Sequence, residues 1–250
     1  MKLHPIEATQ HRTGRPSDLG HCPDHWSRPT PDRALRSALE LRYQVYCLEC
    51  SFLSPDDYPD GVETDEHDDT AAHFYAYDAD KELVGYVRLV RPDVDQRFPF
   101  QQHCATSSEG PVLPVPGETA EISRLMLRRD YRRLRSNKRD GVMAGQKTAV
   151  CAGAKRLGAA QVLLTLYRQM YAYSRTNNIG HWYAAMERPL ARALLRLNVL
   201  FRPIGPEADY YGLVAPYLAN LKEVETYIGT RAPEMLSWLQ QPEWQSTKTA

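Results

Sequence analysis

The chain of 250 residues lacks a long hydrophobic run, an excess of charge of either sign, and tracts rich in glycine or proline. Its longest apolar stretch, near Ala159–Leu166, is far shorter than the roughly 20 residues that cross a bilayer. The first residues lack the apolar core of a secretory signal. Lys plus Arg and Asp plus Glu number 31 each, which argues against a surface that is basic overall and binds nucleic acid everywhere, although local patches stay open. We therefore expect a globular, cytoplasmic protein.

Cysteine is sparse and odd in number, which favours reduced thiols over a disulfide framework. The cysteines are Cys22, Cys47, Cys50, Cys104 and Cys151. Cys47 and Cys50 form one C-x-x-C, which together with the upstream segment HCPDH would supply zinc ligands. A second C-x-x-C is missing and the pair lies on a predicted helix, so buried thiols are the favoured interpretation and no bound metal is expected.

Hydrophobic periodicity and composition divide the chain into three parts. We expect a polar N-terminal arm over residues 1–31, a main domain over 32–221 and a helical C-terminal tail over 222–250. Helices are predicted over Pro31–Cys50, Gly141–Leu157, Arg168–Asn177 and Pro189–Leu197. Strands are predicted in HFYAY and VGYVRLV around a polar turn, in TAEISRLMLR, in AAQVLLTLY and in HWYAAME. This alternation predicts an α/β fold with one mixed sheet between helices.

Seven polar residues interrupt segments that should be buried. They are Arg42 on the first helix, Asp65 and Asp68 in the acidic loop ETDEHDD, Arg88 in the strand GYVRLV, and Glu121, Ser123 and Arg124 in the strand EISRLML. On a regular strand Glu121 and Ser123 share one face and Arg124 lies on the other. Because an unpaired buried charge costs several kcal/mol, the three arginines should pair with the three carboxylates. Residue types alone leave two interpretations, a structural ion-pair cluster or the polar wall of an active site.

The order of these motifs resembles that of the acyl-homoserine-lactone synthases and, more closely, their relatives the N-acyl amino acid synthases. Within that group, LRYQVYCLECSFL and RPIGPEADYYGLVAPYL are similar to acyltransferases associated with the PEP-CTERM/exosortase sorting system. The resemblance covers roughly residues 32–221 and implies the fold of the GCN5-related N-acyltransferases (GNAT), in which the middle strands of the sheet splay apart around an acyl thioester. Phe52 and Tyr46 replace the tryptophan and phenylalanine usual in lactone synthases. Both leave an aromatic wall, but they weaken the case for S-adenosylmethionine as acceptor.

The resemblance implies an enzyme that transfers a fatty acyl group from acyl carrier protein to the α-amine of an amino acid. Glu121 would take the proton of the amine, directly or through water, and Ser123 would bond the thioester carbonyl or the departing thiol. The ion cluster of the substrate pocket would consist of Arg42, Asp65, Asp68, Arg88 and Arg124. An arginine there would hold the carboxylate of the amino acid with two nitrogens. The donor would be acyl-phosphopantetheine, with no tightly bound cofactor.

A basic segment, RRDYRRLRSNKRDG, follows the E-x-S-R strand. Acetyltransferases of this fold that use coenzyme A carry a glycine-containing pyrophosphate loop at this place, and no G-x-G/A is present here. An acidic acyl carrier protein suits the segment better, because opposite charges speed encounter. The expected contacts are Arg128, Arg129, Arg132, Arg133, Arg135, Lys138 and Arg139. A solvated basic loop is the alternative, and no recognisable module supports nucleic acid.

Two other functions stay open at the level of sequence. A lactone synthase that uses S-adenosylmethionine shares the acyl half of the reaction, and a non-catalytic module would bind acidic carriers through the basic segment. The intact set Glu121, Ser123 and Arg124 argues against the second. Tyr167, Tyr171, Tyr173 and Tyr183, with Trp182, either pack in the core or line an acyl tunnel. The acceptor, the chain length and the oligomeric state stay undetermined, and an acylated product favours peripheral contact with a membrane.

Overall fold

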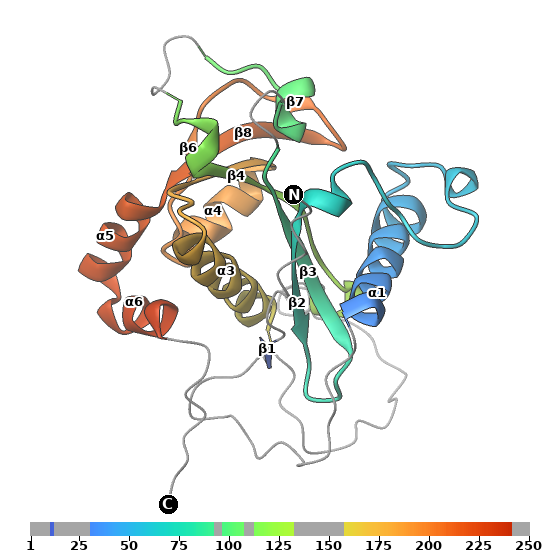
Figure 1. The fold of residues 1–250 in the computed structure, drawn as a ribbon, viewed down its shortest axis with the longest axis horizontal. Helices are drawn as coiled ribbons and strands as arrows, with labels where there is room; N and C mark the ends of the chain where they lie inside the picture. The colour runs from blue at the N-terminus through green and yellow to red at the C-terminus, as the bar shows by residue number, and fades with distance from the viewer. Residues whose placement is uncertain (1–10, 13–30, 93–96, 108–112, 133–157, 242–250) are drawn as a thin grey trace, which may run out of the picture.

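The computed structural model describes residues 11–12, 31–92, 97–107, 113–132 and 158–241. Most of the polar N-terminal arm, the helix predicted over Gly141–Leu157 and the basic residues after Arg132 lie outside the described residues. The predicted fold class is confirmed, because a mixed sheet lies between helices (Figure 1).

The described residues form a sheet of eight strands in the order β1-β2-β3-β4-β5-β8-β6, with β7 paired to β8. Their bounds are β1 His11–Arg12, β2 Ala72–Tyr77, β3 Leu83–Val90, β4 Thr119–Leu127, β5 His181–Met186, β6 Arg202–Pro203, β7 Ala208–Asp209 and β8 Leu213–Asn220. Pairing is antiparallel from β2 to β4 and from β5 to β8, and parallel between β4 and β5. The two central strands therefore run in the same direction.

Within the described ranges, six α-helices flank this sheet. They are α1 Pro31–Tyr43, α2 Arg129–Arg132, α3 Ala159–Thr176, α4 Arg188–Arg196, α5 Leu221–Arg231 and α6 Pro233–Gln240. Figure 1 shows α1 and α3 on opposite sides of β2 and β3. The strands supply both cores, because alternate side chains point to opposite faces. Tyr86 of β3 packs in a cluster with Ala38 of α1, while its neighbour Val87 belongs to the larger cluster with Leu166 of α3.

The segment AAQVLLTLY is the first half of α3, and the strand predicted there is wrong. A short apolar run does not distinguish a buried strand from a buried helix. Here Val162, Leu166 and Met170 recur at helical spacing and are fully buried against the sheet. Gly85 on β3 lets the helix approach, since a Cβ there would lie 2.6 Å from the side chain of Val162. The other strands and helices predicted within the described residues are present.

The central strands separate after a short paired stretch. Pairing between β4 and β5 runs from Thr119 opposite His181 to Ile122 opposite Ala184, and both strands continue beyond it without pairing to each other. A β-bulge interrupts the pairing of β4 with β3 at Arg124, whose φ is +56°. Bulges bend a strand and increase its twist. The predicted splay of the middle strands is thus present.

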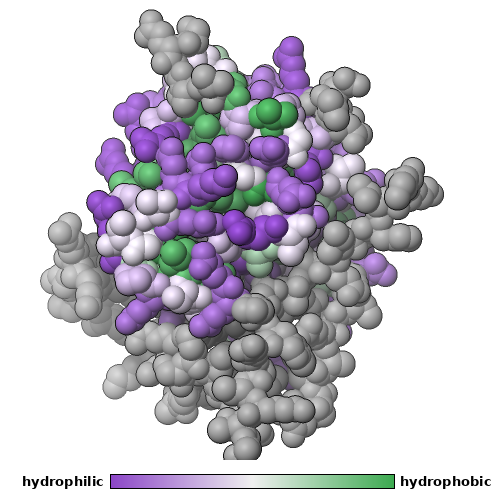
Figure 2. Space-filling model, turned by 60° about the vertical axis from the view of Figure 1, so that its left-hand side comes forward, coloured by the Kyte–Doolittle hydropathy of each residue, from purple (hydrophilic) through white to green (hydrophobic). Residues whose placement is uncertain are grey.

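The face in Figure 2 is mainly hydrophilic, with small separate hydrophobic areas. In the described part of the chain, no helix combines the length and hydrophobicity needed to span a membrane. The helices α5 and α6, which follow β8, add Val224, Ile228 and Leu239 to the same core that α3 covers. Asn220 caps the N-terminus of α5, where its side chain accepts hydrogen bonds from the backbone N–H groups of Lys222 and Glu223.

Candidate active site

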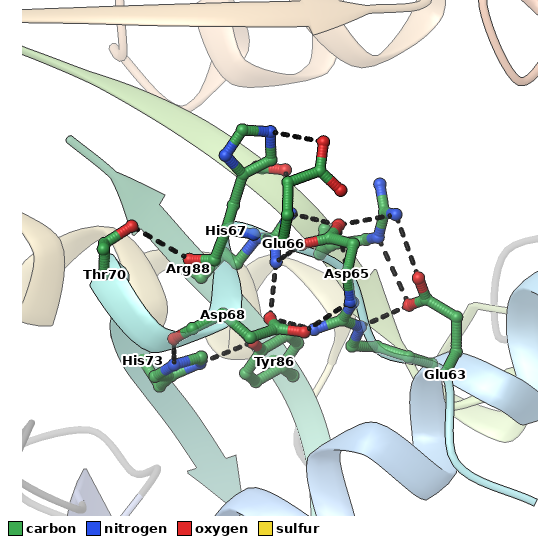
Figure 3. A network of polar contacts seen from close by, with 12 residues as sticks. Glu63, Asp65, Glu66, His67, Asp68, Thr70, His73, Tyr86 and Arg88 are labelled. Atoms are coloured by element: carbon green, nitrogen blue, oxygen red, sulfur yellow. Dashed lines mark hydrogen bonds and ion pairs between the residues drawn. The ribbon is translucent and has the colours of Figure 1, made fainter. Parts of the chain in front are cut away.

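Three arginines and three carboxylates form a network of ion pairs beside the splayed strands. Figure 3 shows part of it, with Arg88 beside Asp65 and Asp68. Arg42 comes from the last turn of α1, Arg88 from β3 and Arg124 from β4. The carboxylates all come from the acidic loop that precedes β2, and they are Glu63, Asp65 and Asp68. The six formal charges cancel, so the cluster is compensated although it is almost entirely buried.

Each arginine engages more than one carboxylate. Arg88 holds Asp65 with two bonds of 2.6 Å, Nη1 to Oδ1 and Nη2 to Oδ2, and also binds Asp68. Arg124 donates from Nη2 to Glu63 at 2.9 Å and from Nε to the same carboxylate at 3.3 Å, and Nη2 lies 2.9 Å from Asp65. Arg42 binds Glu63 and Asp68. None of the three guanidinium groups leaves two free nitrogens for an amino-acid carboxylate, so the expected bidentate hold is wrong for this geometry.

The arginines keep the loop carboxylates ionised. Burial by itself raises the pKa of Asp65, but the hydrogen bonds and positive charge of Arg88 outweigh it and hold that pKa well below its usual range. The pKa of Glu63 is lowered in the same way, with Arg42 and Arg124 outweighing the effect of burial. These groups are therefore fixed counter-ions at neutral pH and are unsuited to accept a proton.

A histidine ties this loop to the sheet. His73 is buried, and its Nε2 donates to the carbonyl oxygen of Asp68 at 3.0 Å, because a carbonyl can only accept. Its Nδ1 then accepts from the hydroxyl of Tyr86 at 2.7 Å. Burial lowers the pKa of His73, which keeps the ring neutral in this arrangement. The loop is thus held by both its backbone and its side chains.

The third carboxylate of the cluster is Glu63. The expectation that Glu121 would pair with the arginines together with Asp65 and Asp68 is wrong. Glu63 begins the motif Glu-x-Asp-x-x-Asp, which is the signal that could have identified it. Its side chain is fully buried between Arg42 and Arg124. Glu121 stands apart from the cluster and forms no ion pair with any described residue.

Glu121 is a buried carboxyl without a cationic partner among the residues that the structure describes. Only 2 % of its surface is exposed, and the backbone N–H of Phe100 donates to its Oε2 at 3.0 Å. Burial raises the pKa of Glu121 to about 8, against the smaller opposing effects of that hydrogen bond and of Arg88 and Arg124. The group therefore exchanges its proton near neutral pH, as a general base requires.

The bulge changes the direction of Arg124. The prediction that Arg124 faces away from Ser123 is wrong, because its left-handed backbone breaks the alternation of β4. Ser123 lies 3.4 Å from Nη2 of Arg88, and Arg124 points to the same side of the sheet. There its guanidinium lies 4.8 Å from the ring centre of Tyr46 and 5.5 Å from that of Tyr211. Both distances are within cation–π range.

Aromatic side chains form a wall beside Arg124. Tyr46 lies in a π-helical segment, Gln44–Glu49, which continues α1, and such segments occur frequently at functional sites. The ring of Tyr46 contacts Phe52 at 5.8 Å and Tyr211 at 5.4 Å between centroids. The sequence predicted the aromatic wall from Tyr46 and Phe52, whereas Tyr211 comes from the distant loop before β8 and was missed.

A cavity of about 320 Å³ opens between the separated parts of β4 and β5. On the α1 side of the sheet it is bounded by Tyr46, Glu121, Ser123 and Arg124, and on the α3 side by Tyr167, Met186 and Leu190. Its other lining residues are Ile122, Leu125, Ala184, Ala185, Glu187, Tyr210, Tyr211 and Val214. The cavity therefore passes through the sheet at the splay and joins the polar cluster to an apolar pocket.

Two arginines in the described part of the basic segment are already engaged with acidic residues. Arg128 bonds Asp130 at 2.9 Å and lies 3.5 Å from Asp78, and Arg132 pairs with Glu49. Arg129 is also described, while Arg133, Arg135, Lys138 and Arg139 lie outside the described residues. Cys47, Cys50 and Cys104 are free thiols. No group of three or more metal-binding side chains occurs among the residues that the structure describes.

Comparisons with known proteins bear on the fold. Residues 41–139 match the family model of the acetyltransferase (GNAT) domain. Among solved structures, TofI in a ternary complex with an inhibitor and MTA superposes with a TM-score of 0.57 at 14 % identity, over 85 % of this chain and 94 % of that one. The CoA-dependent acyl-homoserine lactone synthase BjaI, with SAM and isopentyl-CoA, superposes with a TM-score of 0.51 at 17 % identity, over 84 % of this chain and 92 % of that one. The AHL synthase LasI superposes with a TM-score of 0.50 at 18 % identity, over 76 % of this chain and 83 % of that one.

No curated protein sequence matches the chain significantly. Structural similarity at these identities establishes the fold. The match to the family model covers the segment that carries Arg42, the acidic loop, β3 and β4. Residues 41–139 are therefore similar to the acetyltransferase (GNAT) domain, and the chain shares its fold with the acyl-homoserine lactone synthases.

Proposed function

We propose that the protein is an N-acyltransferase that moves a fatty acyl group from the phosphopantetheine of acyl carrier protein to the α-amine of an amino acid. The observation that carries the proposal is Glu121, a buried, uncompensated carboxyl on the wall of the cavity between the splayed strands. The sequence resemblance to N-acyl amino acid synthases, including those associated with PEP-CTERM/exosortase sorting, supports the choice of product.

The reaction needs a base matched to an amine. An α-ammonium group has a pKa of about 7.7–8.0, and the pKa of Glu121 is raised to about 8, so proton transfer between them is nearly balanced. Glu121 accepts the proton, directly or through water, as the nitrogen attacks the thioester carbonyl. The C–N bond forms, the C–S bond breaks, and the thiolate of the carrier leaves and takes up a proton. Ser123, on the same wall, is placed to hydrogen-bond the carbonyl or the departing sulfur.

The ion cluster supports this wall. Arg88 and Arg124 fix the acidic loop against β3 and β4, and Arg124 is in turn packed against Tyr46 and Tyr211. Because the cluster is neutral and its nitrogens are largely occupied, its role is to position the aromatic wall and the bulge. The acceptor then binds between that wall and Glu121.

The donor side of the cavity borders α4, whose Leu190 lines the cavity. On the surface of this helix Arg192 and Arg196 are exposed, four residues apart, and neither has an acidic partner among the described residues. Like charges at this spacing weakly destabilise a helix. An acidic carrier protein would neutralise them while its phosphopantetheine enters the cavity, so α4 joins the basic segment as a proposed contact with the carrier.

Product analysis tests the proposal directly. Lipid extracts of cells that express the wild-type protein are compared by mass spectrometry with extracts from cells expressing Glu121→Gln and the matched surface variant Glu118→Gln. An N-acyl amino acid that is present with wild type and Glu118→Gln and absent with Glu121→Gln supports the proposal and names acceptor and chain length. An acyl-homoserine lactone would instead make S-adenosylmethionine the acceptor. Purified acyl carrier protein and acyl-CoA donors then identify the donor.

A further inference from the structure

Tyr167 forms part of the cavity wall on the α3 side of the sheet. It lies in the middle of α3, and only 2 % of its surface is exposed. Its ring makes edge contacts with Trp182 at 5.9 Å and Phe201 at 6.4 Å between centroids. The neighbouring wall residues Met186 and Leu190 are apolar. Tyr167 is therefore a rigid aromatic group with one polar atom in an otherwise apolar pocket.

The hydroxyl of Tyr167 is buried and has no hydrogen-bond partner among the described residues. Tyr171, one turn further along the same helix, shows the usual arrangement, since its hydroxyl donates to Glu225 at 2.8 Å. Leaving a buried hydroxyl unpaired costs about 1–3 kcal/mol, and buried polar groups in proteins are normally bonded. Burial also raises the pKa of Tyr167, so the phenol stays protonated and is available as a donor.

We infer that the hydroxyl of Tyr167 donates a hydrogen bond to an oxygen of the thioester-linked donor. This inference rests on the proposed function. Two oxygens share the required chemistry, a carbonyl of the pantetheine arm and a keto or hydroxyl oxygen on the acyl chain. A pantetheine carbonyl would make Tyr167 a general anchor of the donor, whereas a chain oxygen would make it a filter for oxygenated acyl groups.

Binding measurements on two donor analogues test the role of Tyr167 without requiring turnover. Octanoyl- and β-ketooctanoyl-phosphopantetheine, each with a methylene in place of the thioester sulfur, are titrated calorimetrically into the full chain. The proteins are wild type, Tyr167→Phe, and the matched control Tyr171→Phe, whose hydroxyl bonds Glu225 away from the cavity. For Tyr167→Phe we expect the dissociation constant to rise about three- to tenfold, the equivalent of one net hydrogen bond. Tyr171→Phe should bind like wild type.

A thermal melt distinguishes this role from a structural one. Removing an unpaired hydroxyl should leave the melting temperature of Tyr167→Phe unchanged or higher, so weaker binding of the donor in a protein that is no less stable supports the inference. Loss with both analogues assigns the bond to the pantetheine arm, and loss with the keto analogue alone assigns it to the acyl chain. If Tyr167→Phe binds both analogues as wild type does, the inference is overturned while the proposed function stands. If wild type binds neither analogue, the proposed donor site itself fails, and the inference fails with it.

Discussion

The backbone N–H of Phe100 donates to the carboxyl of Glu121 at 3.0 Å, on the wall of a cavity where the neighbouring arginines are already paired with other carboxylates. This hydrogen bond joins the loop before β4 to the centre of the sheet. Glu121 is buried and has no cationic partner among the described residues. Burial therefore outweighs the hydrogen bond from Phe100 and raises the pKa of Glu121 to about 8. The pairing of the cluster residues with one another thus determines which carboxyl is free to exchange a proton.

The first prediction concerns the pH dependence of turnover. Glu121 accepts a proton only when ionised, so kcat at saturating substrates should rise about tenfold per pH unit below pH 8 and level above it. Initial rates between pH 6 and pH 9 check this. Two acceptors whose amines differ in pKa provide the control. If the pH at which the rate levels off shifts with the pKa of the amine, the titrating group is the substrate, which would contradict the assignment to Glu121.

The second prediction concerns the stability of the fold, which should fall with rising pH where activity rises. A carboxyl whose pKa is higher in the folded protein than its ordinary 4.5 stabilises the fold fully below that value, and the stabilisation is lost as pH rises to about 8. Glu121→Gln should therefore gain stability relative to wild type across this range, by roughly a few kcal/mol at the alkaline end. Urea unfolding of both proteins at pH 5 and pH 8.5 measures the difference. If the difference in unfolding free energy between Glu121→Gln and wild type stays constant or decreases from pH 5 to pH 8.5, Glu121 is ionised in the folded protein and the prediction is wrong.

The third prediction concerns the ion cluster. Replacing Arg88 by Ala leaves Asp65 and Asp68 buried without their shared partner, which should cost about 3–5 kcal/mol. Arg88→Lys should also destabilise, because an ammonium cannot reproduce the two parallel bonds to Asp65. The matched control is Arg36→Ala, which removes an exposed pair with Glu40 and should cost about 0.5 kcal/mol or less. Similar losses for Arg88→Ala and Arg36→Ala in chemical denaturation would contradict a mutually dependent cluster.

The existence of the cluster follows from the sequence, but its pairing does not. Charges within apolar strands must be compensated, so the positions of Arg88 and Arg124 in the sequence indicate that each pairs with a carboxylate. The choice between Glu63 and Glu121 depends on the path of the acidic loop, which has no periodic pattern. It also depends on the bulge at Arg124, because a register irregularity arises from strand pairing and leaves no local signal in EISRLML.

The error at AAQVLLTLY has a similar origin. The run is short, apolar and contains β-branched residues, which are properties of a buried strand and of a fully buried helix alike. Its helical state is decided by contacts with the sheet, where Gly85 provides the space for Val162. The consequence for the site is direct, because helix formation places Tyr167 at the cavity and Tyr171 one turn away from it.

The last prediction tests how the donor is presented. If an acidic carrier docks on α4, reversing the charges of Arg192 and Arg196 to Glu should raise KM for a carrier-linked donor several-fold. The same change should leave KM for the equivalent pantetheine thioester unaltered, since both residues are exposed on the helix and neither lines the cavity. Added salt should weaken the carrier-linked reaction of wild type and have less effect on the double variant, because screening acts on exposed charges. Lys222→Glu, an exposed reversal on α5, provides the matched control. A change in KM shared by both donors would show that α4 had been disturbed structurally, whereas no change with either would place the carrier elsewhere, with the basic segment after β4 as the next surface to test.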